Sequence, residues 1–250
     1  IRVDGIVDPP TANITNVNNV TYTFTYNIYE SIVVERDNIV IDGAGYTLQG
    51  NGSGKGIDLS ERYYVTVKNM TIKSFNYGIW LFWSLRHNIT GNNIKNNDIE
   101  GIHLLDSSDN IIYENNITNN NDGIKLDNSD YNRILENNIT NNNHQGIDLH
   151  SSSNHNVIVR NNIENNKEDG IYLSESPNNS IYHNNFVNNT RQVYTYNSTN
   201  FWNENYPSGG NYWSDYNGTD LYSGPYQNET GSDGIGAVSY THLRAHETVL

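Results

Sequence analysis

Apolar residues recur along this chain in short groups in which every second residue is apolar. Between residues 123 and 142, for example, the apolar positions are Ile124, Leu126, Ile134 and Ile139. A spacing of two is the periodicity of a strand, the helical spacing of 3.6 is absent, and β-branched residues dominate. The pattern predicts an all-β chain in which three short strands per repeat are separated by turns rich in Asn and Ser.

A Gly-Ile-x-Leu motif marks the repeat. Its glycines are Gly56, Gly78, Gly101, Gly123, Gly146 and Gly170, at spacings of 22, 23, 22, 23 and 24 residues. Asn-Asn pairs follow, beginning at Asn92, Asn115, Asn137, Asn161 and Asn184. Three strands in 22–24 residues predict one rung of a right-handed, single-stranded parallel β-helix, with rungs about 4.8 Å apart.

This geometry predicts which polar side chains face the interior. Asn132, Asn137 and Asn142 fall at the corners of a rung, where inward amide side chains can form a ladder with the rungs above and below. The second Asn of each Asn-Asn pair is expected to face solvent. Two of these residues, Asn116 and Asn138, begin Asn-x-Thr sequons and are the predicted glycosylation sites.

The ends of a stacked helix must be closed against pairing with another chain. We expect an N-terminal cap over residues 1–37 that leads into the first rung, and repeats over residues 38–200. Residues 201–236 form an aromatic C-terminal cap, whose predicted plug consists of Trp202, Tyr206, Tyr212 and Trp213.

Residues 237–250 differ in composition from the rest of the chain and resemble the in-frame translation of a sequencing adapter. We therefore expect a non-native tail there. The sequence opens at Ile1 without a signal peptide, which is expected of a mature form or a fragment.

Composition narrows the functional classes. The net charge of −14 disfavours nucleic acid and anionic membranes as partners, and no apolar run of membrane-spanning length occurs in the sequence. The absence of Cys excludes disulfides and thiolate metal sites. Twelve sequons among 46 Asn fit an extracellular, secreted glycoprotein, although an Asn-rich chain also produces sequons by chance.

Polar residues beside the Gly-Ile-x-Leu motifs are expected on one outward face. The candidate catalytic residues there are Asp122, Lys125, Asp127, Asp148, His150 and Asp169, and the candidate glycan-binding residues are Trp80, His103 and Tyr172. Inverting glycosidases need two carboxyl groups about 6.5–9.5 Å apart, which Asp127 and Asp148 can provide from adjacent rungs. A solvated face of any acidic chain would look similar, so catalysis and non-catalytic glycan binding both stay open.

The sequence supports a metal site less strongly than a glycan-binding face. The oxygen ligands that calcium prefers occur at Asp215, Asn217, Asp220 and Asp233, without the spacing of an EF-hand. No other cofactor is expected, because the histidines outside residues 237–250 form no i, i+2 or i, i+4 ligand pair.

The repeated Gly-Ile-x-Leu and Asn-Asn rungs, with segments 34–48 and 209–216, resemble the NosD or CASH class of β-helix in the pectin-lyase-like superfamily, in particular archaeal surface proteins. The resemblance implies a carbohydrate-related or structural scaffold and, more weakly, copper handling in the periplasm. Three hypotheses remain. The first and favoured one is a non-catalytic cell-surface protein, structural or binding a polysaccharide or surface glycan. The others are a polysaccharide hydrolase or lyase that uses the Asp122–Asp169 face, and a copper-handling periplasmic protein.

Overall fold

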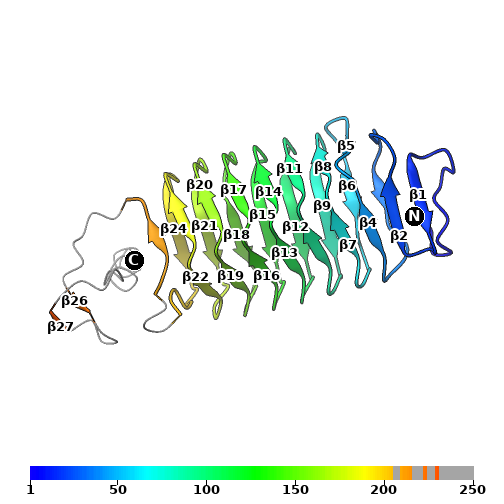
Figure 1. The fold of residues 1–250 in the computed structure, drawn as a ribbon. Helices are drawn as coiled ribbons and strands as arrows, with labels where there is room; N and C mark the ends of the chain where they lie inside the picture. The colour runs from blue at the N-terminus through cyan, green and yellow to red at the C-terminus, as the bar shows by residue number, and fades with distance from the viewer. Residues whose placement is uncertain (205–208, 216–221, 224–228, 231–250) are drawn as a thin grey trace.

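The chain winds into a parallel β-helix whose turns stack along one axis (Figure 1). This computed structural model describes residues 1–250 except 205–208, 216–221, 224–228 and 231–250. Each turn contributes one strand to each of three long sheets, so the predicted right-handed, three-stranded rung is confirmed. None of the described residues lies in a helix, and this part of the chain therefore holds no helix able to cross a membrane.

The first sheet has nine strands in the order β1 (Ile14–Val17), β2 (Thr21–Phe24), β4 (Val40–Asp42), β7 (Thr66–Lys68), β10 (Asn88–Thr90), β13 (Ile111–Tyr113), β16 (Arg133–Leu135), β19 (Val157–Val159) and β22 (Ser180–Tyr182). The second has eight: β5 (Thr47–Gln49), β8 (Thr71–Lys73), β11 (Asn93–Lys95), β14 (Asn116–Thr118), β17 (Asn138–Thr140), β20 (Asn162–Glu164), β23 (Asn185–Val187) and β25 (Tyr212–Trp213).

The third sheet carries the Gly-Ile-x-Leu motifs. Its eight strands are β3 (Ile32–Val33), β6 (Lys55–Asp58), β9 (Tyr77–Phe82), β12 (Glu100–Leu105), β15 (Asp122–Asp127), β18 (Ile147–His150), β21 (Asp169–Ser174) and β24 (Arg191–Tyr196). A separate antiparallel pair joins β26 (Tyr222–Ser223) to β27 (Glu229–Thr230).

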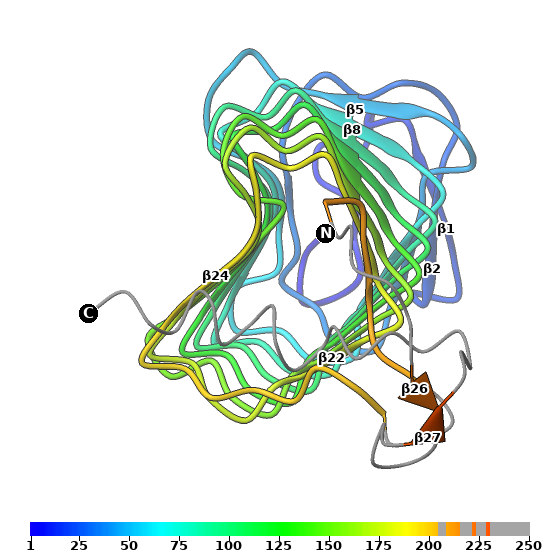
Figure 2. The ribbon, with the colours of Figure 1, turned by 90° about the vertical axis from the view of Figure 1, so that its left-hand side faces the viewer.

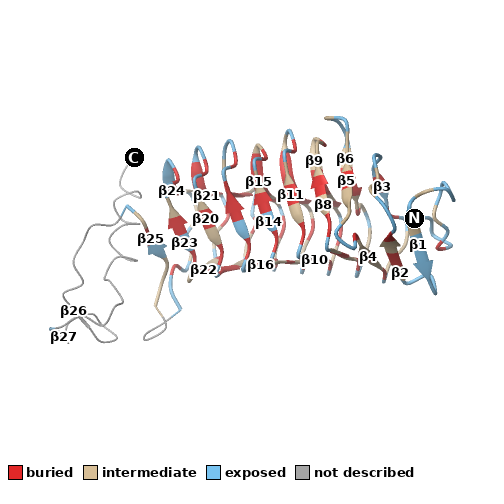
Figure 3. Ribbon diagram, turned by 45° about the horizontal axis from the view of Figure 1, so that its top comes forward, coloured by how far each residue is buried: buried red, intermediate tan, exposed pale blue. Residues whose placement is uncertain are grey.

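The core consists of apolar side chains that stack from rung to rung. The expected column of Ile102, Ile124, Ile147 and Ile171 is confirmed, because each pairs in register with the next and all are fully buried. Buried residues run along the strands of successive turns (Figure 3). Burial of each such side chain contributes about 1.5–3 kcal/mol to stability.

Ladders of buried polar side chains line the corners. In one ladder Asn115 donates from its backbone N–H to Asn137 Oδ1 at 2.9 Å, and Asn137 donates in the same way to Asn161 at 2.9 Å. The inward placement of Asn132, Asn137 and Asn142 is therefore confirmed. Ladders of this kind satisfy the backbone groups that a corner would otherwise leave unpaired.

A parallel ladder of serines runs through Ser107, Ser129 and Ser153. Ser129 lies six residues after the motif glycine Gly123, so the same spacing from Gly146 predicts Ser152 for the next rung, but the structure places Ser153 in the ladder. Ser151 and Ser152 both adopt positive φ angles, so the longer rung takes up its extra residue in the turn and moves the buried position to Ser153.

Parallel pairing begins earlier than residue 38. Strand β2 already pairs with β4, Ile28 bridges to Leu48, and β3 pairs with β6. Residues from Thr21 onward therefore contribute to all three sheets, while β1 closes the outer edge by antiparallel pairing with β2.

At the other end, Trp213 stacks on Phe186 with ring centroids 4.6 Å apart, and Trp202 lies beside it. Both tryptophans are buried in the core, as expected of a plug, whereas Tyr212 is exposed because it alternates with Trp213 on β25. Tyr206 and residues 237–250 lie outside the described residues. The division into two caps and a repeat region remains a proposal.

Candidate functional site

The Gly-Ile pair of each motif bends the third sheet. A Cβ on Gly123 would lie 2.4 Å from the Gly146 carbonyl oxygen and 2.8 Å from Ile139 Cγ2, so both Gly123 and Ile124 face the interior. Two successive inward residues break the strict alternation of a strand and act as a bulge. The residue before the Gly and the residue after the Ile then share the outer surface, and the sheet is concave on that side (Figure 2).

Outward side chains form rows that run along the helix axis. The row after each motif Ile reads Asp58, Trp80, His103, Lys125, Asp148, Tyr172 and Tyr194 in register. The row before the Gly contains Lys55, Tyr77, Glu100 and Asp122 and, farther along, Asp169 and Arg191. A third row includes the paired residues Asp127 and His150. We call the surface formed by these three rows the charged face.

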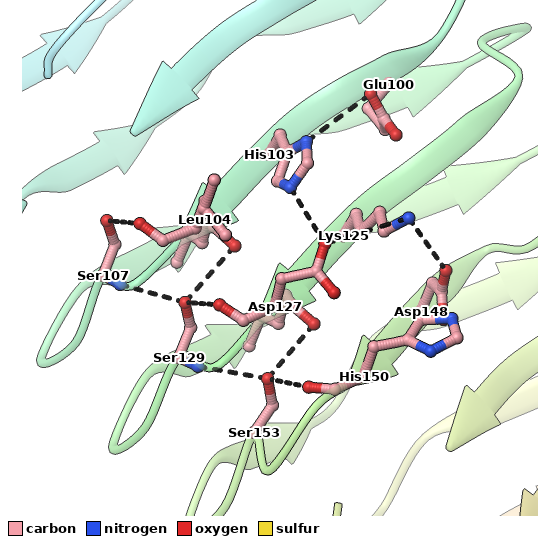
Figure 4. A network of polar contacts seen from close by, with 12 residues as sticks. Glu100, His103, Leu104, Ser107, Lys125, Asp127, Ser129, Asp148, His150 and Ser153 are labelled. Carbon is pink, nitrogen blue, oxygen red and sulfur yellow. Dashed lines mark hydrogen bonds and ion pairs between the residues drawn. The ribbon is translucent and has the colours of Figure 1, made fainter. Parts of the chain in front are cut away.

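The centre of the charged face is a network of ion pairs (Figure 4). His103 lies between two carboxylates, with Nδ1 3.6 Å from Glu100 Oε2 and Nε2 3.3 Å from Asp127 Oδ2. Lys125 Nζ lies 3.9 Å from both Asp127 Oδ2 and Asp148 Oδ2. These two carboxylate oxygens are therefore separated by no more than twice that distance, which is below the upper limit of about 9.5 Å for a two-carboxylate glycosidase.

Aromatic rings extend the network toward the N-terminal side. Trp80 makes edge-to-face contacts with Tyr77 and His103, each with ring centroids 4.7 Å apart. Lys55 Nζ lies 4.5 Å from the Trp80 ring centroid and pairs with Asp58 at 2.9 Å.

On the C-terminal side the same combination recurs. Tyr172 stacks on Tyr194 at 5.0 Å, and the Arg191 guanidinium lies 4.1 Å from the centroid of the Tyr194 ring while pairing with Asp169. Aromatic platforms thus flank the charged centre on both sides.

Several charged groups of this surface are buried against one another. Glu100, Asp122 and Asp148 are only 4%, 7% and 4% exposed. Burial, reinforced by the charges of Asp148 and Glu100, raises the pKa of Asp122 to about 6. Burial also opposes ionisation of Asp127, but the His103 hydrogen bond and the Lys125 charge outweigh it and lower the pKa of Asp127.

The neighbouring carboxylates raise the pKa values of the cationic groups. Burial disfavours the charged form of His103, yet its contacts with Asp127 and Glu100 outweigh this effect and raise the pKa of His103. The pKa of Lys125 is raised despite burial because Asp148 and Asp127 lie beside it. The Asp148 carboxylate, with Oδ1 2.9 Å from His150 Nε2, raises the pKa of His150.

The structure gathers most of the residues singled out in the sequence on this face. Lys125, Asp127, Asp148 and His150 share the central network, and Asp122 lies next to it in the row before the Gly. Asp169 lies apart from the network, two rungs beyond Asp122, in its pair with Arg191. Trp80, His103 and Tyr172 occupy one row.

Six further residues of this face were not identified as site candidates, among them Asp58 in the row after the motif Ile. Glu100 occupies the same motif position as Asp122, and this equivalence was a usable signal. Tyr77 and Lys55 precede earlier glycines by one residue in the same way, whereas Arg191 and Tyr194 belong to a rung that lacks the Gly-Ile-x-Leu motif.

The two predicted glycosylation sites are exposed neighbours on the second sheet. Asn116 pairs in register with Asn138, and Asn138 Nδ2 donates to Asn116 Oδ1 at 2.8 Å. Asn116 Nδ2 in turn donates to Asn93 Oδ1 at 3.0 Å. A glycan on either amide nitrogen would replace one of these surface hydrogen bonds.

The expected calcium ligands are mostly outside the described residues. Asp215 is described and exposed, while Asn217, Asp220 and Asp233 are not described. Within the described part of the chain, no group of three or more His, Asp or Glu is placed to hold a metal ion. His87 has a structural role instead: its Nδ1 accepts the Val65 N–H at 3.0 Å, and burial lowers its pKa to about 4.

Comparison with known proteins agrees with this architecture. Residues 11–218 match the sequence profile of a family described as "Periplasmic copper-binding protein (NosD)". A crystal structure of a mutant of the periplasmic alginate epimerase AlgG superimposes with a TM-score of 0.57 and 24% identity, over 64% of this chain and 39% of that one. The Dettilon tailspike protein gives a TM-score of 0.52 and 16% identity, over 77% of this chain and 50% of that one.

These structural similarities concern the fold. The chain spans 39% and 50% of the lengths of the two proteins. No curated protein sequence matches the chain significantly.

The residues that the structure describes do not fit a copper site. Copper prefers soft sulfur ligands or clustered imidazoles. The chain has no Cys, its one Met, Met70, is 3% exposed in the core, and the described histidines are not gathered into a ligand set.

Proposed function

Because the chain belongs to the NosD family of right-handed parallel β-helix proteins, we propose that it is an extracellular, non-catalytic scaffold that binds a polysaccharide along the charged face. The observation that carries this proposal is the register of the outward rows. Trp80, His103 and Tyr172 belong to one row, in which each rung presents one side chain about 4.8 Å from the next. That spacing is close to the length of one sugar unit in an extended polysaccharide.

The chemistry of the face suits a glycan. Aromatic rings present apolar faces on which the C–H surfaces of a sugar can stack, and the charged groups between them offer donors and acceptors for hydroxyl groups. Tyr77 and Trp80 supply such rings on one side of the network, and Tyr172 and Tyr194 on the other.

Binding without cleavage is supported by the pairing of the central carboxylates. Asp127 contacts both His103 and Lys125, and Asp148 contacts both Lys125 and His150. Each carboxylate is thus held by cations of the protein.

Affinity electrophoresis against a panel of polysaccharides tests the proposal. Trp80→Ala and Tyr172→Ala should each weaken binding about three- to tenfold, through loss of a stacking surface. Tyr113→Ala is the matched control, because Tyr113 lies on the outer face of the first sheet. The proposal fails if no polysaccharide retards the protein, or if the three variants behave alike.

A second candidate function, polysaccharide cleavage, is favoured by one observation. The Oδ2 atoms of Asp127 and Asp148 each lie 3.9 Å from Lys125 Nζ, so these two carboxylates are close enough to act as the pair of a glycosidase. Size-exclusion chromatography of the bound polysaccharide distinguishes the two functions. Shortening that disappears in Asp127→Asn would establish cleavage, whereas an unchanged length distribution supports binding alone.

A further inference from the structure

The centre of the charged face has an excess of carboxylates. Between β12 and β18 it contains the carboxylates of Glu100, Asp122, Asp127 and Asp148 and the cationic or titratable groups of Lys125, His103 and His150. When His103 and His150 are both protonated, one negative charge is left over, and only protonation of His144 beside Asp122 would neutralise it. A carboxylate-bearing sugar placed here would be repelled, and a cationic sugar would be attracted.

The excess is concentrated at Glu100 and Asp122. These residues pair in register on adjacent rungs and are 4% and 7% exposed. Among the ion pairs of the described residues, neither carboxylate has a Lys or Arg within 4.0 Å; their contacts are with His103 at 3.6 Å and His144 at 3.8 Å. The other carboxylates of the network are each within that distance of Lys125.

Glu100 is moreover missing a donor. Its Oε2 atom is buried and has no hydrogen-bond partner, and the facing His103 Nδ1 also lacks one, because 3.6 Å is too long for a hydrogen bond. A buried carboxylate oxygen without a donor is costly. A ligand that brings a charged N–H donor to this position would remove that cost.

The surroundings indicate what kind of ligand brings the donor. Tyr77 precedes Glu100 in the same row and offers a ring beside the carboxylate pair. Lys125 lies on the next strand, and the nearby carboxylates of Asp148 and Asp127 stabilise its ammonium group. The network is therefore suited to binding an ammonium group. A divalent metal is a poorer occupant, because the described residues supply no third carboxylate or imidazole in ligand geometry.

We propose that Glu100 and Asp122 form a subsite for the protonated amino group of an amino sugar within the bound polysaccharide. This inference rests on the proposed function and specifies its ligand: a glycan with free amino groups, in preference to a neutral or acidic one. The amino group lies over the paired carboxylates of Glu100 and Asp122 and offsets their excess negative charge, while the sugar ring lies toward Tyr77.

Isothermal titration calorimetry with matched oligosaccharides tests the subsite. A six-unit β-1,4-linked glucosamine oligomer and the corresponding glucose oligomer differ only in the group at C2, and a mannuronate oligomer adds an acidic group. At pH 6.5 the glucosamine oligomer should bind about tenfold or more tightly than the glucose oligomer, as expected for charge-assisted hydrogen bonds. The mannuronate oligomer should bind most weakly.

Variants identify the residues responsible. Glu100→Gln keeps the side-chain shape and should abolish the preference for the glucosamine oligomer over the glucose oligomer. Asp122→Asn is the second variant, in case the first does not fold. Asp58→Asn is the control, because this carboxylate lies on the same face but already pairs with Lys55 at 2.9 Å; it should retain the preference.

The outcomes separate the two levels of the proposal. Equal or tighter binding of the glucose or mannuronate oligomer overturns the amino-sugar subsite and leaves polysaccharide binding in place. A glucosamine preference that survives in both Glu100→Gln and Asp122→Asn also overturns the subsite, because general attraction to an acidic protein would then explain it. Failure of all three oligomers to bind overturns the subsite and the proposed function together.

Discussion

Replacing Asn137 by Ala tests whether the corner ladders stabilise the helix. Asn137 Oδ1 accepts the backbone N–H of Asn115 at 2.9 Å and its side-chain amide at 3.0 Å. Asn137 Nδ2 donates to Ile112 O at 2.8 Å and to Asn161 Oδ1 at 3.0 Å. Alanine removes all of these bonds at a site that is 1% exposed, where water cannot replace them.

The magnitude follows from the groups left without partners. An unsatisfied buried donor or acceptor costs about 1–3 kcal/mol. The Asn115 N–H loses its acceptor and the Ile112 carbonyl loses a donor. We therefore expect Asn137→Ala to lower the free energy of unfolding by about 2–4 kcal/mol, near the upper end for single substitutions.

Asn138→Ala is the matched control. Asn138 follows directly in the sequence and also bonds to its neighbours, with Nδ2 2.8 Å from Asn116 Oδ1 and Oδ1 3.0 Å from Asn162 Nδ2. It is exposed, so water replaces these bonds and the expected loss is below about 0.5 kcal/mol. Urea denaturation followed by circular dichroism measures both variants. Equal losses would refute the argument that burial, rather than the number of hydrogen bonds, sets the contribution of a ladder Asn.

Three further changes have definite expected outcomes. Gly123→Ala forces a Cβ to within 2.4 Å of a backbone oxygen and should lower the free energy of unfolding by more than about 3 kcal/mol or prevent folding. Gly45→Ala is the control: its Cβ meets open space, but the φ angle of +85 should still lower the free energy of unfolding by about 1–2 kcal/mol. Thermal melts compare the two variants. Asp122→Asn should stabilise the protein by about 2 kcal/mol at pH 8 and leave it unchanged at pH 4 in urea titrations. The pKa of Asp122 is about 6 in the folded protein and 3.8 ordinarily. Ionisation of Asp122 therefore lowers the free energy of unfolding as the pH rises through that interval, and Asn avoids this loss. In a glycosylating host, mass spectrometry should find a glycan on Asn116 or Asn138 of one molecule and not on both, because the two side chains are bonded neighbours; frequent double occupancy would contradict this.

The repeat was predictable from the sequence because each rung imposes the same constraints. The position of Gly123 recurs where a Cβ would meet the next rung's backbone, and Asn137 recurs where a corner needs a donor and an acceptor on one short side chain. The requirement for Gly and the requirement for Asn both arise from contacts with the adjacent rungs, so the two residues recur once per rung in the sequence. The prediction fails at Ser152, because the turn there holds one extra residue. This residue moves the buried position to Ser153, and neighbouring serines look alike in the sequence.

The candidate site was only partly predictable. The row that contains His103 and Lys125 follows from strand alternation after the motif Ile. The position of Glu100 on the same surface could be predicted from its equivalence to Asp122, but its approach to within 3.6 Å of His103 depends on the bulge at the Gly-Ile pair, which strand alternation does not predict. Burial of Glu100 and Asp122 on an outward face arises from the concavity that this bulge creates, and no local sequence signal encodes it.

Hydroxyl-radical footprinting of the protein with and without bound polysaccharide tests the central claim most directly. If the glycan lies along the charged face, Trp80, Tyr172 and Tyr194 should become protected from oxidation, while Tyr113 and Tyr182 on the outer face of the first sheet should react as before. Protection of the first-sheet tyrosines with no change at Trp80 and Tyr172 would place the glycan on another surface and contradict the account.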